Sequence, residues 1–310
     1  MKLDFSVKQA MKVVVVLVCA VAVIAASIVM INGDDDKIKN KNDELWNTIK
    51  ELNGSGGSES GGSGGGSNNP TSGPNGEPLV STTESQVGKY ADIDGDGTVD
   101  GIIFADLLFG GSGEYGPSGM GIYTIPTISS SKSYYISQES YTNKLGGTAE
   151  VLTPIGGGND RFYVMTLNDI TYSSSVEWMN HYWYKTASDN MADFATTTSQ
   201  EFGAGRQNTL NMIKKWNNKA YGEQSTKDIW GEIQEQVSNG WFLPSSGELS
   251  AFAKQLGITK SNYSSKGLFS NYWSSSQYNT YMAYNIYLSN GYVYINYVSD
   301  GLPVRLATTF

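Results

Sequence analysis

The chain has almost no cysteine or histidine: Cys19 and His181 are the only residues of these types among 310. Cys19 lies in a hydrophobic run near the N-terminus, so no disulfide can form within the rest of the chain. Stability there must come from packing or bound ions. A lone histidine among aromatic residues is more typical of a packed, hydrogen-bonded side chain than of a catalyst. Phosphate-loop and zinc motifs are absent, and no nucleophile elbow occurs after residue 79. We therefore expect no enzymatic activity.

Charged residues are scarce, at 16% of the chain, and positive charge is in deficit. There are 21 Lys and Arg against 30 Asp and Glu, which gives a net charge of −9. This balance provides no basic face for nucleic acid. An acidic surface rich in Gly, Ser and Tyr is typical of proteins on the outside of a bacterial cell or a phage.

A long uncharged run covers residues 13–31, preceded by lysines in residues 1–12 and followed by acids at 34–36. At about 1.5 Å per residue, a helix over this run is about 28 Å long, close to the hydrocarbon thickness of a bilayer. The flanking charges predict a cytoplasmic N-terminus, a transmembrane signal anchor and an extracellular C-terminal region. A cleaved signal peptide is the alternative, although the run is longer than a usual signal core.

Three further segments follow the expected anchor. Residues 32–52 are polar, with Ile38, Leu45 and Leu52 at seven-residue spacing, which predicts a stalk helix and leaves self-association open. Residues 53–78 are rich in Gly and Ser, which predicts a flexible linker. Residues 79–310 form the expected globular domain, an α+β structure of short strands, two to three helices and irregular loops.

An acidic loop lies early in this domain. Its aspartates occupy positions 1, 3, 5 and 9 of a calcium-loop pattern, but position 12 is Ile103, so a complete EF-hand is excluded. Two interpretations remain open: a looser calcium site, or a metal-free turn between strands at 90–93 and 98–107. No cofactor is required by the second interpretation. The candidate calcium ligands are Asp92, Asp94, Asp96 and Asp100.

The second half of the domain alternates predicted helices and strands. Apolar spacing, with Leu210, Ile213 and Trp216 on one side, predicts a helix over 209–216. Another helix is expected to begin at Asp228 and to end at Asn239. Ser245 and Glu248 have the spacing of a capping box for a third helix, through residue 256. The expected strands cover residues 161–167, 241–244 and 303–306.

The most informative segment is 271–305, which holds eight of the 20 tyrosines. Residues 284–288 and 292–296 alternate aliphatic with Tyr or Asn side chains around a loop at 289–291. This predicts a hairpin with one buried aliphatic face and one face of phenols. Tyrosine offers large contact area and a hydroxyl at little entropic cost, as in antibody paratopes. A half-buried sheet face without a binding role is the alternative.

The composition of residues 278–304 adds a second indication. This stretch contains no Lys, Glu, Gln or Trp, although these types are frequent just upstream. An Asn codon ending in C cannot reach those four types by changes in its first two bases. Every residue of the stretch except Met282 can be reached in that way, so Met282 must be a fixed position if the stretch is diversified.

The order of these parts resembles the variable proteins of diversity-generating retroelements. The resemblance is carried by Trp241–Leu249 (WFLPSSGEL), by Tyr272–Ser276 (YWSSS), by the Tyr/Asn-rich hairpin, and by Val304 and Arg305. It is strong over 161–310 and weaker over 90–160. It implies a C-type-lectin fold, in the branch related to formylglycine-generating enzymes, and a scaffold that includes Trp273, Ser274 and Arg305. The enzymes of that branch use cysteine chemistry, which this domain lacks.

The resemblance further implies that adenine-directed mutagenesis rewrites Asn codons in the variable region, 271–305. The ligand-binding positions that it implies are Tyr278, Thr280, Tyr281, Tyr284, Tyr287, Tyr292, Tyr294, Asn296, Tyr297, Ser299 and Asp300.

The resulting hypothesis is a membrane-anchored display protein that binds an extracellular protein or glycan through its C-terminal hairpin. The first alternative is a fixed-sequence adhesin or surface-assembly subunit whose tyrosine face packs against another copy. The second alternative, a surface hydrolase dependent on His181, ranks last.

Overall fold

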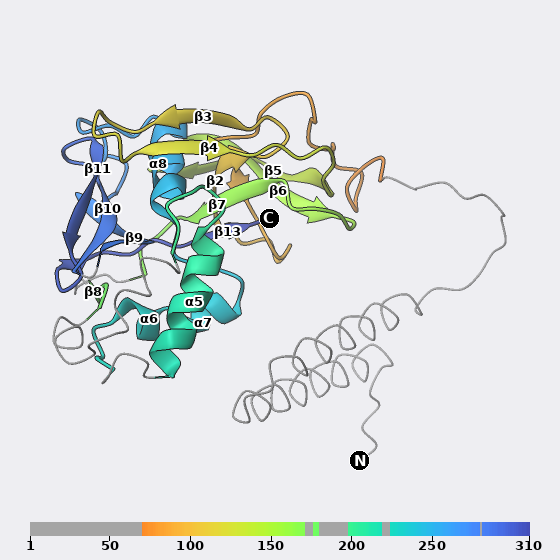
Figure 1. Cartoon of the computed structure of the whole chain (residues 1–310). Helices are drawn as coiled ribbons and strands as arrows, with labels where there is room; N and C mark the ends of the chain where they lie inside the picture. The colour runs from red at the N-terminus through yellow and green to blue at the C-terminus, as the bar shows by residue number, and fades with distance from the viewer. Residues whose placement is uncertain (1–69, 171–175, 180–197, 219–223, 280) are drawn as a thin grey trace, which may run out of the picture. The chain divides into compact units, whose positions relative to one another are not determined.

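The computed structural model describes residues 70–170, 176–179, 198–218, 224–279 and 281–310. Within these ranges the chain is a mixed α+β structure of mostly short strands in several sheets, as the sequence predicts (Figure 1). The described residues form four helices where the sequence predicts two to three. The expected anchor, the stalk helix and residues 53–69 of the linker lie outside the described residues. No helix in the described ranges is long and apolar enough to span a membrane.

The largest sheet has six strands in the order β13-β7-β2-β1-β6-β5, and all neighbours are antiparallel except β1 and β6. The predicted strand pair around the acidic loop is confirmed, because β1 pairs with β2. The strands are β1 (Tyr90–Ala91), β2 (Gly101–Asp106), β5 (Ser133–Asn143), β6 (Gly147–Ile155), β7 (Phe162–Thr166) and β13 (Ala307–Thr309).

A second sheet holds the predicted hairpin. It has three antiparallel strands in the order β11-β10-β9, so β11 is at its edge. Its strands are β9 (Asn271–Asn279), β10 (Met282–Tyr287) and β11 (Tyr292–Tyr297). Two smaller pairs join β3 (Gly111–Glu114) with β4 (Ile122–Ile125), and β8 (Val176–Glu177) with β12 (Gly301–Leu302).

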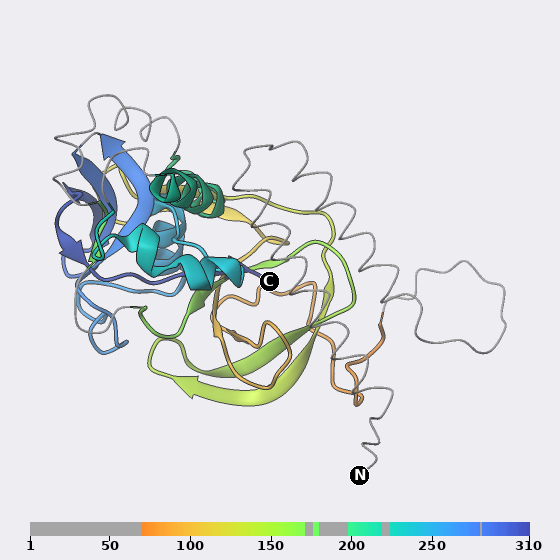
Figure 2. The same ribbon diagram turned by 90° about the horizontal axis from the view of Figure 1, so that it is seen from below.

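The described helices are α5 (Gly205–Asn217), α6 (Ile229–Glu232), α7 (Gln234–Ser238) and α8 (Ser246–Gln255). Both views place α5 beside the three-stranded sheet (Figures 1 and 2). The long β5–β6 hairpin lies away from that sheet in both views. The capping box at the start of α8 is confirmed, since Ser245 Oγ accepts from Glu248 N and Ser245 N donates to Glu248 Oε2.

The three-stranded sheet is packed on both faces along β9. Tyr272 belongs to a core that includes α8, the six-stranded sheet and the inner face of the hairpin. The next residue, Trp273, belongs to a second core with α5 and α6. Successive strand residues point to opposite faces, which explains why neighbours in the sequence lie in different cores. A third core, around Phe162 and Phe310, covers the other face of the six-stranded sheet.

Three sequence-based expectations about individual elements are wrong, and a fourth holds at one residue only. The helix expected to bury Leu210 instead leaves it 46% exposed and buries Asn208, Thr209 and Met212. The polar residues can be buried because they are hydrogen-bonded: Asn208 Nδ2 donates to Ser199 O, and Thr209 Oγ1 donates to Gly205 O.

The single helix expected from Asp228 is divided into α6 and α7 at Ile233, whose φ of −96° and ψ of 2° depart from helical values. Residues 303–306 form no strand but connect β12 to β13. Of the predicted strand at 241–244, only Phe242 makes a bridge, with Ala307.

Candidate functional site

The outer face of the β10–β11 hairpin carries a row of tyrosines. Tyr287 pairs with Tyr292 across the strands, and Asn285 pairs with Tyr294. The rings of Tyr287 and Tyr292 meet edge to face with centroids 6.2 Å apart, and those of Tyr292 and Tyr294 do so at 5.9 Å. The opposite face is aliphatic, with Ile286 only 1% exposed. The predicted alternation is confirmed at Tyr292, Val293 and Tyr294 of β11, but not along β10, where Tyr284, Asn285 and Ile286 are all buried.

A second group of tyrosines lies at the other end of the hairpin. Tyr278, Tyr281 and Tyr297 are 44%, 50% and 56% exposed, and Tyr294 between the two groups is 47% exposed. A hydrogen bond from Val298 N to Tyr281 O, at 2.9 Å, joins the segments that carry Tyr281 and Tyr297. The expected binding residues therefore include four exposed tyrosines of the three-stranded sheet and the link between β9 and β10.

The polar candidates form a hydrogen-bonded chain. The buried Asn285 donates from Nδ2 to Asn296 Oδ1 at 2.8 Å, and Asn296 Nδ2 donates to Asp300 Oδ2 at 2.8 Å. Ser299 and Asp300 are partly exposed, next to the end of β11. Asn296 and Asp300 thus stabilise the hairpin by hydrogen bonds, and both side chains are also partly exposed to solvent.

Two of the expected binding positions need separate comment. Tyr284 lies on the inner face, is 5% exposed, and meets the ring of Tyr278 edge to face at 5.4 Å. Burial raises the pKa of its phenol. Tyr284 lies two residues before Ile286, and strand residues two apart share a face, which was the sequence signal for this inward orientation. Thr280 lies outside the described residues, as does His181.

The residues expected to form the scaffold are buried beneath the hairpin. Trp273 Nε1 donates to Val176 O at 2.9 Å, and Ser274 Oγ donates to Tyr284 O at 2.7 Å. Arg305 Nε donates to Asp169 Oδ1 at 2.7 Å, with both side chains more than nine-tenths buried. Because both tryptophan and arginine find polar partners inside the core, the position of β9 and of the chain end near Arg305 is well determined.

The serines that follow Trp273 in β9 act as buried connectors. Ser276 Oγ accepts from Ser246 N at the start of α8 and donates to Ser199 O. Ser275 Oγ accepts from Asn208 Nδ2 of α5 at 3.1 Å. Two small hydroxyl side chains therefore attach the three-stranded sheet to α5 and α8, a role that the sequence does not reveal.

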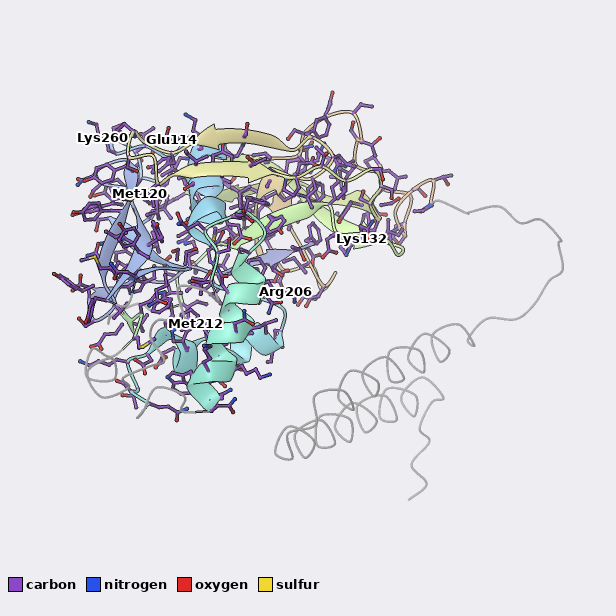
Figure 3. The ribbon with its side chains drawn as sticks, viewed as in Figure 1. Glu114, Met120, Lys132, Arg206, Met212 and Lys260 are labelled. Atoms are coloured by element: carbon purple, nitrogen blue, oxygen red, sulfur yellow. The ribbon has the colours of Figure 1, made fainter. Side chains whose placement is uncertain are left out.

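A cleft of about 680 Å³ lies at the turn of the hairpin. Its walls come from residues 115–117 between β3 and β4, from Lys254 and residues 257–260 at the end of α8, and from residues 290–292. Figure 3 labels Lys260, and Glu114 and Met120 of the β3–β4 hairpin, at the same end of the domain. The segments that line the cleft are far apart in the sequence, so sequence reasoning missed it.

The acidic loop brings together three of its four expected ligands. Carboxylate oxygens of Asp92, Asp94 and Asp100 lie within 4.8 Å of one another, whereas Asp96 is not part of the group. Asp96 Oδ1 instead accepts from Thr98 N at 2.6 Å. Burial, and then the nearby charges of the other aspartates, raise the pKa of Asp100. Clustered carboxylates of this kind are chemically suited to a hard cation such as calcium.

Comparison with family models, with curated proteins and with solved structures finds no match to this chain. The residues of the hairpin, their burial and their contacts are therefore the basis on which a function can be assigned.

Proposed function

We propose that this chain is a surface-displayed protein that binds ligands through its β10–β11 hairpin, on a C-type-lectin-type fold. The hairpin is a face diversified by a retroelement, the domain is extracellular, and residues 13–31 anchor it in a membrane. The ligand is a protein or glycan on another cell or phage. No enzymatic activity and no obligatory cofactor belong to this function.

The observation that carries the proposal is the row formed by Tyr287, Tyr292 and Tyr294. These rings project from strands whose other face is part of a packed core. A substitution in the row changes the surface without opening a cavity, which is the condition that a rewritten binding face must meet. Rigid tyrosines also supply contact area at little cost in side-chain entropy.

The buried scaffold supports the same proposal. Trp273, Ser274 and Arg305 all lie at positions that the resemblance assigns to the constant scaffold, and each is hydrogen-bonded inside the domain. Exposed rings such as Tyr294 and buried scaffold residues such as Trp273 therefore lie on strands of the same small sheet. Such a division allows one surface to vary while the fold stays the same.

One observation favours the alternative of a fixed surface-assembly subunit. β11 is an edge strand among the described sheets, and it carries the exposed Tyr294 and Tyr297. An edge strand with exposed aromatic residues is suited to pairing with a second copy of the same chain. The two functions differ in whether the tyrosine face contacts another copy or a different molecule.

Sequencing of the chromosomal or phage locus tests the diversification. A second copy of the repeat that encodes residues 271–305, with adenines at the variable positions, is expected beside a reverse transcriptase gene. If neither is present, the hairpin is not diversified in this way.

A triple variant, Tyr287→Ser, Tyr292→Ser and Tyr294→Ser, separates display from assembly. We expect the full chain carrying these changes to keep its oligomeric state in light scattering and to lose binding to a panel of bacterial cells and phage particles. Phe109→Ser, at an aromatic residue 42% exposed away from the hairpin, is the matched control and should retain binding. Dissociation of an oligomer by the triple variant would favour the assembly subunit.

A further inference from the structure

The cleft at the hairpin turn joins constant and variable parts of the chain. Gly116 approaches the turn so closely that a Cβ atom there would lie 2.3 Å from Gly291 O and 2.5 Å from Tyr292 Cβ. On the other side, the end of α8 contributes Lys254 and Lys260. With a volume of about 680 Å³, the cleft is within the range of about 300–1,000 Å³ that is typical of small-ligand sites.

The charged residues that line the cleft are both positive. Lys254 and Lys260 are exposed, and neither makes a salt bridge with any described residue. Glu114, at the end of β3, is not among the residues that line the cleft, and its Oε1 accepts a hydrogen bond from Gly119 N at 2.8 Å. Two uncompensated lysines in a chain of net charge −9 attract an anion to this position.

Besides glycines, Pro117 and Ile258, the rest of the lining consists of aromatic rings and neutral hydrogen-bonding groups. Tyr292 borders the cleft and also contacts Tyr287 and Tyr294, so the cleft continues directly into the tyrosine row. Asn290 lines it as well, and its Nδ2 donates to Tyr292 Oη at 3.2 Å. Thr259 adds a hydroxyl on the opposite wall. Flat rings together with amide and hydroxyl groups match the C–H faces and hydroxyls of a sugar.

We propose that this cleft binds the carboxylate-bearing sugar of an acidic glycan. Lys254 and Lys260 pair with the carboxylate, while the Tyr292 ring packs against the sugar ring. Asn290 and Thr259 hydrogen-bond to its hydroxyls. An acidic peptide fits less well, because extended peptides are usually bound along a strand edge or a groove, whereas this cleft is bounded by three separate segments of the chain that meet at the hairpin turn.

The position of the lysines has a consequence for diversification. Both lie outside residues 271–305, whereas Asn290 and Tyr292 lie inside that region. The charge that attracts the carboxylate is therefore constant, and the groups that contact the sugar ring and its hydroxyls can change. Acidic glycans are thus a ligand class for the display function proposed above, and this inference rests on that function.

The test uses the full chain in detergent and isothermal titration with a uronic-acid oligosaccharide and a sialylated trisaccharide. The methyl ester of each sugar serves as an uncharged ligand of nearly the same shape. The variant is Lys254→Gln with Lys260→Gln. The control is Lys227→Gln, a lysine whose side chain is 71% exposed elsewhere in the domain.

We expect at least one acidic sugar to bind and its methyl ester to bind about tenfold more weakly. The affinity of the double lysine variant for the acidic sugar should also fall about tenfold. Lys227→Gln should have no effect, and added salt should weaken binding of the acid only. Absence of binding by both acids, equal binding of acid and ester, or full binding by the double variant would each overturn the proposal. Lysine-dependent binding of a poly-glutamate peptide in place of the sugars would reassign the cleft to acidic peptides.

These outcomes are distinguishable from a failure of the display function. If the locus has no template repeat, diversification is wrong, but lysine-dependent sugar binding by the cleft is still measured directly. If the tyrosine triple variant loses cell binding while the double lysine variant keeps it, the display function stands and the cleft is not its sugar site.

Discussion

Gly116 lies where the turn between β3 and β4 contacts the turn of the β10–β11 hairpin. Its φ is +79°, and Gly291 opposite has a φ of +78°. The two glycines differ in their surroundings, since a Cβ on Gly291 would find its nearest atom at 3.9 Å, whereas a Cβ on Gly116 would overlap the hairpin backbone. The pair therefore separates the effect of backbone conformation from the effect of close packing.

We predict that Gly291→Ala costs about 1–2 kcal/mol of unfolding free energy, because alanine disfavours the left-handed region. Gly116→Ala should cost about 1–3 kcal/mol more, because the hairpin must move to accommodate the methyl group. Urea denaturation of both variants provides the measurement. Equal losses would mean that the contact between the two turns does not contribute to stability.

Glu248 is fully buried at the start of α8 and has no cationic partner among the described residues. Burial raises the pKa of its carboxyl from 4.5 to about 7, although the N–H groups of Ser245, Gly205 and Gly203 oppose the rise. The folded state therefore holds this proton more tightly than the unfolded chain. The stability that Glu248 contributes is present below pH 4.5 and is lost as the pH rises through about 7.

For this reason we predict a difference between the pH profiles of the wild type and Glu248→Gln. The wild type should lose up to about 3 kcal/mol between pH 4.5 and pH 7 from this group, whereas the variant should lack that part of the slope. The variant should keep the capping box, because glutamine at this position can also accept a hydrogen bond from Ser245 N. Glu235→Gln, at an exposed helical glutamate, should keep the wild-type profile, and an unchanged profile for Glu248→Gln would contradict the prediction.

At the scale of the element, the two faces of the β10–β11 hairpin have different roles. Tyr284 is in the core with Ile286 and Val293, whereas Tyr294 is 47% exposed. Both are tyrosines in positions that the resemblance assigns to ligand binding. Their burial predicts that only one of them can change freely, because loss of a buried ring leaves a cavity.

We predict that Tyr284→Ser lowers the free energy of unfolding by about 3–5 kcal/mol, while Tyr294→Ser lowers it by less than about 1 kcal/mol. Chemical denaturation of the two variants at one temperature checks this difference. Natural copies of the hairpin should accordingly keep a large apolar or aromatic residue at 284 and vary at 294. Similar losses for the two variants would mean that the inner and outer faces are not distinct.

At the scale of the whole molecule, a net charge of −9 and an acidic loop beside the six-stranded sheet favour a stabilising cation. Asp92 follows β1 and accepts hydrogen bonds from Gly95 N, Gly97 N and Thr153 Oγ1, so the loop is formed by protein contacts. A bound calcium ion would add to that stability by neutralising like charges that lie close together.

We predict that calcium raises the melting temperature of the full chain and that a chelator reverses the rise. Asp94→Asn should abolish the response to calcium, because Asp94 belongs to the group of three carboxylates. Asp96→Asn should leave it intact, because Asp96 is outside that group. Identical melting curves for the wild type with calcium and with chelator would remove calcium from the description of this loop.

Local patterns in the sequence determined the hairpin and the start of α8. The alternation around Ile286 and Val293 specified which side chains face the core, and Ser245 with Glu248 specified a helix start, because strand alternation and capping depend on residues within a few positions of each other. The absence of cysteine after residue 19 likewise excluded disulfides from the domain without any knowledge of its fold.

Only the tertiary structure decided how distant segments meet. Leu210 is exposed and Asn208 buried because Ser199 and Ser275 lie within hydrogen-bonding distance of Asn208. Three of the four loop aspartates come together while Asp96 does not, and the cleft forms from residues near 116, 259 and 291. The bond between Asn208 and Ser275 and the cleft depend on contacts between parts of the chain that are separated by tens of residues, and local spacing carries no information about such contacts.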